Sequence, residues 1–232
     1  MGNHLSSTRQ IKSFVLRAGR YSKRQQEALD NMAHLYEIES NQQMWDLKEI
    51  FDKDADTVVE IGFGMGRSLF QMAQANPEIN YLGIEVHRAG VGSLVADLNE
   101  YQVENVRIAS HDAVEVFKYN IPDESLAGVQ VFFPDPWPKK KHHKRRLIQP
   151  EFVQLLCRKL KPGGVIHCAT DWEDYAHHMM DVLKSTKGIQ NTQEGENFCP
   201  RPEHRPLTKF ENRGKNLGHG IWDLMFMKCT NG

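Results

Sequence analysis

The sequence predicts an α/β fold built on a mostly parallel, doubly wound sheet. From residue 57 onward, short apolar runs alternate with longer amphipathic segments, which is the pattern of repeated strand–helix units. A glycine-rich turn directly follows the first of these runs, where such folds pass from a strand into a helix. With 232 residues and 40% hydrophobic side chains, the chain can bury one core, and we expect a single domain over residues 1–232.

Each expected element is identified by the spacing of its apolar residues. The strands are short apolar runs at residues 57–62, 80–85, 105–110, 128–133, 164–170 and 221–227. The helices carry apolar side chains at helical spacing over residues 67–75, 88–101, 113–119, 150–160 and 172–183. We expect every helix to pack on one face of the sheet.

Two segments fall outside this alternation. Residues 1–26 contain six arginine and lysine side chains and no acidic one, which predicts a basic arm followed by one helix. Residues 186–219 are polar, and Pro200, Pro202 and Pro206 exclude long regular structure there. Because long ordered loops in a compact domain are usually functional, this segment is a candidate for substrate contact.

Composition argues against several classes of protein. The four cysteines form no C-x-x-C pair, so we expect buried thiols in a reducing compartment and neither a zinc site nor a disulfide framework. His142, His143, His177 and His178 lack the spacing of metal ligands, so no metal is expected. No apolar run reaches membrane-spanning length, and no signal-peptide core follows the amino terminus. One targeting alternative stays open at this point, because an arginine-rich, acid-free start also fits an organellar transit peptide.

The glycine-rich turn EIGFGMGRS indicates a site for a methyl donor. It contains Glu60, Gly62, Gly64 and Gly66 in an acid-x-Gly-x-Gly-x-Gly order. The dinucleotide fingerprint requires glycine at the position of Arg67 and has no leading acid. S-adenosylmethionine carries positive charge on sulfur and on its amino group, so it favours a nearby carboxylate, whereas a pyrophosphate favours bare helix amides. We expect S-adenosylmethionine here, with a nicotinamide cofactor of an oxidoreductase as the alternative.

Two more acids follow the next strands at the same edge of the sheet. Glu85 ends the second strand about 20 residues beyond the glycine turn, where a carboxylate can accept hydrogen bonds from both ribose hydroxyls. Asp112 follows the third strand, where an acid can accept a hydrogen bond from the adenine amino group. A helix cap is the alternative for each single acid. Three acids at three successive strand ends favour a cofactor site.

The turn PDPWP after the fourth strand is the expected catalytic position. Asp135 lies there at the switch point of the sheet, where it would face the methyl group. Three prolines stiffen the turn, and Trp137 offers a flat face on which a base could stack. Enzymes that methylate exocyclic amino groups carry Asp/Asn-Pro-Pro-aromatic, whereas this chain lacks the second proline. An amino-group nucleic-acid methyltransferase of the N6-adenine type is therefore the alternative function. A turn that merely ends the strand, without a function, is the structural alternative.

The run KKKHHKRR, residues 139–146, places six fixed positive charges directly after this turn. Phosphates are the matching partner, and a polyanion would reach Asp135 only across this run. A nuclear-localisation tract or a solvated helix start are the alternatives. The side chains expected to contact RNA phosphates are Lys140, Lys141, Lys144, Arg145 and Arg146.

With these motifs together, the chain resembles the bacterial tRNA (guanine-N7)-methyltransferases of the TrmB family. The resemblance runs through IKSFVLRAGR, EIGFGMGRS, GIEVHRAGVG, HDAVEV, VFFPDPWPKKKHHKRRLIQPEF, ATDWEDYA, TKFENRG and LGHGIWDLMF. It implies the Rossmann-like fold of class I S-adenosylmethionine-dependent methyltransferases, with an antiparallel last strand. It also implies methylation at N7 of guanine 46 in the variable loop of tRNA.

The resemblance further implies roles for single residues. Glu60, Glu85, Asp112 and Asp135 match positions used around S-adenosylmethionine, and Asp135 also matches the active-site acid. The positions assigned to substrate are matched by Lys139, Asp171, Thr208, Lys209, Phe210 and Glu211. Because the arm itself resembles the family, we expect a cytoplasmic enzyme rather than an organellar one. Its expected partner is tRNA, without a membrane or an obligate protein partner, as a monomer or homodimer; a non-catalytic RNA-binding module is the remaining alternative.

Overall fold

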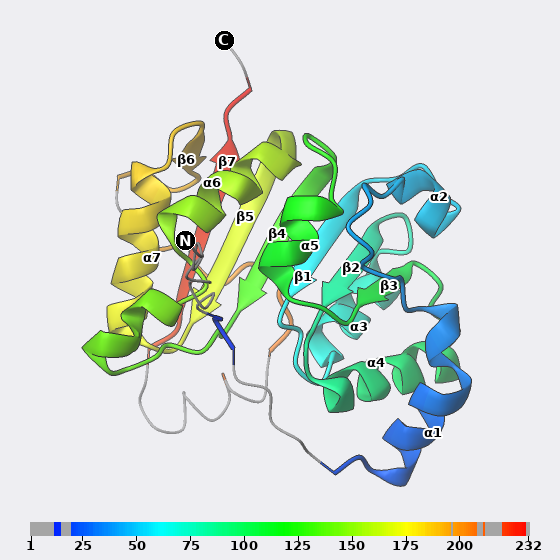
Figure 1. Ribbon diagram of the computed structural model, residues 1–232. Helices are drawn as coiled ribbons and strands as arrows, with labels where there is room; N and C mark the ends of the chain where they lie inside the picture. Colours follow the sequence, from blue (N-terminus) through cyan, green and yellow to red (C-terminus); the bar gives the residue numbers. More distant parts are fainter. Residues whose placement is uncertain (1–11, 15–19, 196, 208–210, 212–219, 231–232) are drawn as a thin grey trace, which may run out of the picture.

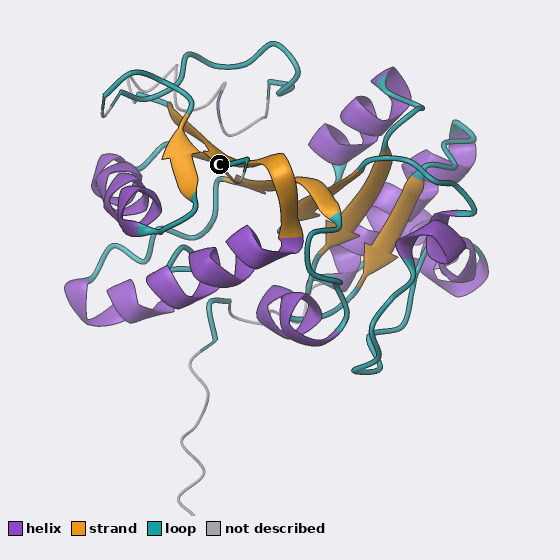
Figure 2. Cartoon of the chain, turned by 90° about the horizontal axis from the view of Figure 1, so that it is seen from above, coloured by secondary structure: helices purple, strands orange, loops and turns teal. Residues whose placement is uncertain are grey.

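The structure is a computed structural model that describes residues 12–14, 20–195, 197–207, 211 and 220–230. Helices lie on both faces of a seven-stranded sheet whose strand order is β3-β2-β1-β4-β5-β7-β6 (Figures 1 and 2). Neighbouring strands from β3 to β5 are parallel, whereas β7 is antiparallel to both β5 and β6. This is the doubly wound arrangement with an antiparallel last strand.

All six expected strands are present. Their bounds are β1 Thr57–Ile61, β2 Asn80–Ile84, β3 Val106–Ala109, β4 Leu126–Phe132, β5 Leu160–Thr170 and β7 Trp222–Lys228. The sequence did not predict β6 (Ile189–Asn191), a three-residue strand that pairs with the end of β7. Strands β4 and β5 also begin earlier than expected, because a register shift between Leu126 and Gly128 lets Leu126 pair with Leu160.

The five expected helices are present as well. Their bounds are α3 Arg67–Ala75, α4 Arg88–Glu100, α5 Ala113–Tyr119, α6 Pro150–Lys159 and α7 Glu173–Ser185. The chain ahead of β1 differs from the single helix that the sequence predicted. It forms α1 (Lys23–Asn31), the 3₁₀ helix η1 (Ala33–Leu35) and α2 (Leu47–Phe51). The interruption has a local cause, since residue 37 forms a bridge with β3 and Asp46 starts a new helix by capping Lys48 and Glu49.

Each face of the sheet has its own apolar core. On one face, α5, α6 and α7 contribute Phe117, Leu156 and Met179 to a core that includes Val59 and Val131 of the central strands. On the other face, α1, α3 and α4 pack over β2 and β3. The segment 197–207 contacts both faces, since Phe198 packs against the first core and Arg205 lies on the second face against Asp223 of β7. In the part of the chain that the structure describes, no helix has both the length and the apolar character needed to cross a membrane.

Candidate active site

A cleft of about 1200 Å³ opens at the carboxyl ends of β1, β2 and β4. The turn after β1, Glu85 after β2 and the turn that carries Asp135 after β4 all line it. Strand β1 lies between β2 and β4. After β1 the chain builds β2 and β3 on one side of it, and later β4 and β5 on the other side, so the strand order reverses at β1. Doubly wound sheets bind their ligands at such a switch point. Two of the three acids that the sequence analysis placed at strand ends, Glu60 and Glu85, therefore meet in one cleft with the PDPWP turn.

The glycine turn has a backbone that other residues adopt only with strain. Gly62, Gly64 and Gly66 have φ angles of 71°, 58° and 79°, all in the left-handed region. A Cβ atom at Gly66 would also lie 2.6 Å from the Cβ atom of Leu94, so glycine lets α3 and α4 approach closely. The turn therefore exposes its backbone to the cleft while the helices behind it remain packed.

Glu85 fixes the shape of this turn. One of its oxygens, Oε2, accepts a hydrogen bond of 2.9 Å from the amide of Gly64. The other, Oε1, accepts from the amides of Val86 and His87 at 2.8 and 3.0 Å. Each carboxylate oxygen can accept more than one hydrogen bond. The expected contact with ribose hydroxyls is therefore compatible with these bonds, and it stays a prediction.

Glu60 is a buried acid with unused bonding capacity. Its side chain is 2% exposed, it lines the cleft, and its Oε2 atom is buried without a hydrogen-bond partner in the described structure. Burial, followed by the negative charge of Glu85, raises the pKa of Glu60 to about 8. A buried acceptor without a partner is costly in a folded protein, and a cationic ligand in the cleft would satisfy it.

Asp112 has a structural role that the sequence analysis held open. Its carboxylate accepts a hydrogen bond of 3.0 Å from the amide of Val114 and so caps the amino end of α5. Its neighbours His111 and Ala113 line the cleft, and Asp112 itself does not. The expected contact with adenine has no support from this geometry and stays a prediction.

The turn that carries Asp135 is strained on both sides of the acid. Phe133 and Trp137 have φ angles of 52° and 46°, a region that bulky residues rarely adopt. The carboxylate of Asp135 accepts a hydrogen bond of 3.1 Å from the amide of Trp137, and the Phe133 amide donates to the carbonyl of Ala169 at 2.8 Å. Such strain persists only where the surroundings hold it, and it is concentrated at functional sites.

Trp137 is more enclosed than the sequence predicted. The residue is 8% exposed, and its Nε1 atom donates to the carbonyl of Ser13 at 3.2 Å. The guanidinium of Arg145 lies 3.9 Å from the centre of a Trp137 ring. Arg145 therefore covers one side of the ring, while Trp137 still lines the cleft, and the expected stacking of a base on this ring stays a prediction.

The basic run separates into exposed lysines and two arginines that bind the protein itself. Lys139 is exposed, and the 3₁₀ helix η2 (Lys140–Arg145) presents exposed side chains at Lys140, Lys141 and Lys144. Arg145 instead donates to the carbonyls of residues 12 and 14 at 3.2 and 3.3 Å while it covers Trp137. Arg145 remains partly exposed, so its predicted phosphate contact is compatible with these bonds and stays a prediction.

Arg146, unlike Arg145, is buried, and its predicted phosphate contact is wrong. It is 3% exposed, donates to the carbonyl of Pro136 at 3.0 Å and forms an ion pair with Asp174. Its guanidinium carbon lies 4.8 Å from the centre of the Tyr175 ring. Arg146 thus fastens the PDPWP turn to α7, and it is too buried to contact a phosphate.

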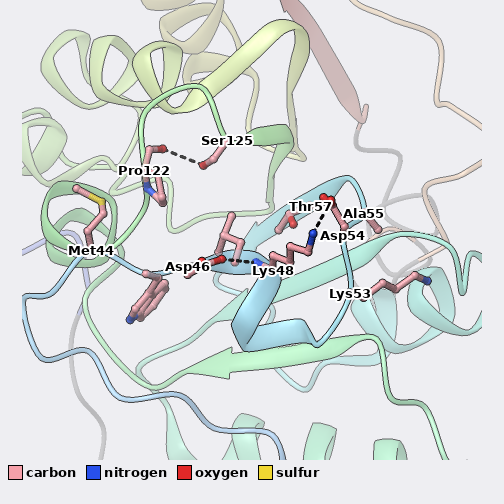
Figure 3. A pocket seen from close by; sticks show the side chains of 11 residues that line it. Met44, Asp46, Lys48, Lys53, Asp54, Ala55, Thr57, Pro122 and Ser125 are labelled. Atoms are coloured by element: carbon pink, nitrogen blue, oxygen red, sulfur yellow. Dashed lines mark hydrogen bonds and ion pairs between the residues drawn. The ribbon is translucent and has the colours of Figure 1, made fainter.

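A second hollow, of about 490 Å³, lies at the opposite edge of the sheet (Figure 3). It is bounded by Thr57 at the start of β1 and by Pro122 and Ser125 ahead of β4. Figure 3 shows Lys48 pointing toward Asp54, and the two side chains form an exposed ion pair of 3.0 Å. None of the residues expected at the active site lines this hollow.

Comparison with known proteins decides the family. Residues 54–224 match a family model described as "Putative methyltransferase". A tRNA (guanine-N(7)-)-methyltransferase from Legionella pneumophila strain Lens is 62% identical over 222 residues, which cover 95% of this chain and 99% of the relative. The chain belongs to the tRNA (guanine-N7)-methyltransferase family. Another family member, from Shewanella amazonensis, is 55% identical over 94% of this chain and 92% of its own length.

Solved structures that resemble this tRNA (guanine-N7)-methyltransferase family member share its fold at low identity. The 16S rRNA methyltransferase KamB aligns with a TM-score of 0.59 and 13% identity, over 81% of this chain and 95% of that one. The aminoglycoside resistance methyltransferase NpmB1 aligns with a TM-score of 0.55 and 14% identity, over 80% and 94% of the two chains. At these identities the likeness shows the fold alone.

The positions that the family resemblance assigned to substrate are only partly within the described structure. Asp171 is partly exposed just after β5. Glu211 is 1% exposed, and its carboxylate forms an ion pair of 2.8 Å with Arg205. Thr208, Lys209 and Phe210 lie outside the described residues. The substrate roles of these residues stay predictions.

Other residues around the site were missed by reasoning from the methyltransferase motifs. The cleft is also lined by Ser13, Phe63, Phe70, Tyr101 and Leu147. A buried polar cluster joins His167 of β5 and Asp223 of β7 to Arg205 of the segment 197–207. One signal for this cluster was available in the sequence, since His167 and Asp223 are polar residues within otherwise apolar strands.

Proposed function

We propose that this protein transfers a methyl group from S-adenosylmethionine to N7 of a guanine in tRNA, at position 46 of the variable loop. One observation carries the proposal. A single cleft combines the unpartnered Glu60 carboxyl, the glycine turn and the Asp135 turn, and exposed lysines follow directly. The 62% identity to a tRNA (guanine-N(7)-)-methyltransferase supports the choice of substrate and atom.

The residues of the cleft fit the proposed cofactor. S-adenosylmethionine supplies an activated methyl group when bound, and it carries positive charge on sulfur and on its amino group. The Oε2 atom of Glu60 offers an acceptor for such a charge inside a buried site. The turn over residues 62–66 leaves room for close approach to its backbone, since a Cβ atom at Gly62 or Gly64 would meet nothing within 4 Å. Glu60, the turn and Glu85 are therefore the proposed cofactor contacts.

The proposed chemistry needs positioning more than proton transfer. Guanine N7 has an in-plane lone pair, so it can attack a methyl group without first losing a proton. Alignment of reacting groups contributes about 7–11 kcal/mol in favourable systems. Asp135, exposed at the mouth of the cleft, orients the base, and its negative charge balances the positive charge that the purine acquires. No strong general base is required.

The lysines after the turn are the proposed docking surface for tRNA phosphates. Four of them are exposed, at Lys139, Lys140, Lys141 and Lys144. Replacing Lys140 with alanine is expected to reduce the slope of log affinity against log salt concentration by about 0.7–0.9, because one phosphate contact is lost. Filter-binding titrations at several salt concentrations measure this slope. Lys48→Ala at the opposite edge of the sheet is the matched control, and equal slopes for the two variants would exclude Lys140 from the interface.

Glu60 makes cofactor affinity dependent on pH. Since its pKa is raised from 4.5 to about 8, the carboxyl in the free protein is protonated below that pH and must lose a proton to pair with a cation. Affinity for S-adenosylmethionine is therefore expected to rise with pH, approaching tenfold per unit below about 8, and to level above it. Calorimetry from pH 6 to 9 measures the effect. Glu60→Gln should bind weakly and without this slope; an unchanged slope in that variant would assign the pH dependence to other groups.

Product analysis separates the proposed reaction from its rivals. Modified tRNA is digested to nucleosides, and the methylated nucleoside is identified by mass spectrometry. N7-methylguanosine is expected, whereas N6-methyladenosine would support an amino-group methyltransferase. Binding of tRNA without turnover would support a non-catalytic RNA-binding module. We further propose that the protein acts in the cytoplasm, with tRNA as its partner, as a monomer or a homodimer.

A further inference from the structure

Arg205 is fully buried although it carries a permanent charge. It belongs to the segment 197–207, which follows β6, and its exposed fraction is 0%. Its Nε and Nη2 atoms donate to the two carboxylate oxygens of Asp223 in β7 at 2.7 and 2.8 Å. Its Nη1 atom donates to Oε2 of Glu211 at 2.8 Å. Paired hydrogen bonds of this kind fix the orientation of the guanidinium plane as well as its place.

This cluster contacts the residues that lead into the PDPWP turn. The guanidinium carbon of Arg205 lies 5.9 and 5.7 Å from the ring centres of Phe132 and Phe133. His167 in β5 shares the Oδ1 atom of Asp223, at 2.8 Å, and packs edge-on against Phe132 with ring centres 4.9 Å apart. Arg205 therefore touches both aromatic residues at the carboxyl end of β4.

The contacts of Arg205 lie next to the strained backbone around Asp135. Phe133 and Trp137 both have left-handed backbones, and both need their side chains held from outside. Arg145 covers the Trp137 ring from one direction, and Arg205 lies against the Phe133 ring from another. Asp135 lies between these two residues. An arginine thus lies against the residue two positions before Asp135 and against the residue two positions after it.

We propose that Arg205 is a positioning residue for methyl transfer. It holds Phe133 in its left-handed conformation and thereby sets the direction of Asp135. Its ion pair with Glu211 also joins one predicted substrate position to the same point of the sheet. Lysine would keep the charge of Arg205, but its ammonium group lacks the rigid, planar set of donors with which a guanidinium hydrogen-bonds to two carboxylates. This inference rests on the proposed function, because the acid that it positions is the proposed active-site acid.

The test compares Arg205→Lys with Arg107→Lys. Arg107 donates to the carbonyls of Ile50, Glu104 and Val106 around β3, away from the PDPWP turn, so its variant loses guanidinium bonds without touching the site. Arg205→Lys is expected to lower kcat about 100-fold, because small displacements of aligned groups have effects of this size. The Kd for S-adenosylmethionine is expected to change less than about twofold, since the proposed cofactor contacts lie on β1 and β2. Arg107→Lys should leave both constants unchanged.

A spectroscopic readout separates positioning from general stability. The protein is labelled with 5-fluorotryptophan, and its four tryptophan signals are assigned in ¹⁹F NMR spectra by tryptophan-to-phenylalanine variants. In Arg205→Lys the Trp137 signal is expected to move, whereas the Trp45 signal at the other edge of the sheet stays in place. In Arg107→Lys the Trp137 signal should stay in place.

The outcomes distinguish this inference from the proposed function. If Arg205→Lys has a lowered melting temperature but keeps its kcat and the Trp137 signal, Arg205 is a structural residue and the inference is wrong. If the lysine variant does not fold, Glu211→Gln serves in its place, because it removes one charge and keeps the pair with Asp223. Since Glu211 is itself a predicted substrate position, the Trp137 signal decides here: a moved signal supports the proposal, and an unmoved signal overturns it. If the unmodified protein does not methylate guanine, the proposed function fails, while the Trp137 signal still decides whether Arg205 positions the turn.

Discussion

Replacing Asp135 with asparagine is expected to lower kcat by about 10²–10³-fold, the usual effect of removing one electrostatic contact from a transition state. Asparagine keeps an Oδ1 atom that can accept the hydrogen bond from the Trp137 amide, so the turn is retained. What is lost is the negative charge that balances the cationic purine. Single-turnover methylation of unmodified tRNA, at saturating S-adenosylmethionine, measures the chemical step directly.

Asp46 offers a matched control for this substitution. Its Oδ1 atom also accepts a hydrogen bond from the amide two residues further on, that of Lys48 at 2.9 Å, but at the opposite edge of the sheet. Asp46→Asn should keep the wild-type kcat, because asparagine caps a helix about as well as aspartate does. Equal turnover in Asp135→Asn and the wild type would remove Asp135 from the chemistry.

Replacing Arg146 with methionine is expected to lower the free energy of unfolding by about 2–3 kcal/mol. The substitution removes the ion pair with Asp174, the hydrogen bond to the Pro136 carbonyl and the contact with the Tyr175 ring. Because the carboxylate of Asp174 is largely exposed, it can return to water, which keeps the loss moderate. Urea denaturation followed by circular dichroism measures the change.

The comparison variant is Lys141→Met, five residues earlier in the same basic run. Lys141 is exposed and belongs to the proposed phosphate-binding surface. Its replacement should leave the free energy of unfolding within about 0.5 kcal/mol of the wild type, as surface substitutions usually do. It should nevertheless weaken tRNA binding at low salt. If both variants had the same stability, the division of this run into an internal arginine and external lysines would be wrong.

The sheet was predictable because its signal is local. Each strand and helix of the repeated units has its own apolar spacing. The glycines of the turn likewise indicate its left-handed backbone, because glycine adopts positive φ angles without strain. The convergence of Glu60, Glu85 and Asp135 on one cleft also followed from the sequence, since parallel strands end at the same edge. The chain ahead of β1 was harder, because the contact of residue 37 with β3 joins segments far apart in sequence.

Contacts between residues far apart in sequence show what local patterns do not contain. Six charges in one run suggested one common role, yet Arg146 points inward because Asp174 and Tyr175 lie beside it on α7. The enclosure of Trp137 depends on its own positive φ and on the carbonyl of Ser13. The pairing of Arg205 with Asp223 likewise joins a loop to a strand, and the sequence spacing between them has no characteristic pattern.

The central claim is that the methyl group of S-adenosylmethionine reaches N7 of one guanine in tRNA. The most direct test incubates the purified protein with unmodified tRNA and methyl-labelled cofactor, then cleaves the RNA chemically at N7-methylguanosine and maps the break. Cleavage at a single guanine of the variable loop, strongly reduced over the same reaction time in Asp135→Asn, is the predicted result. Label on adenine, label spread over many guanines, or cleavage outside the variable loop would contradict the proposed reaction.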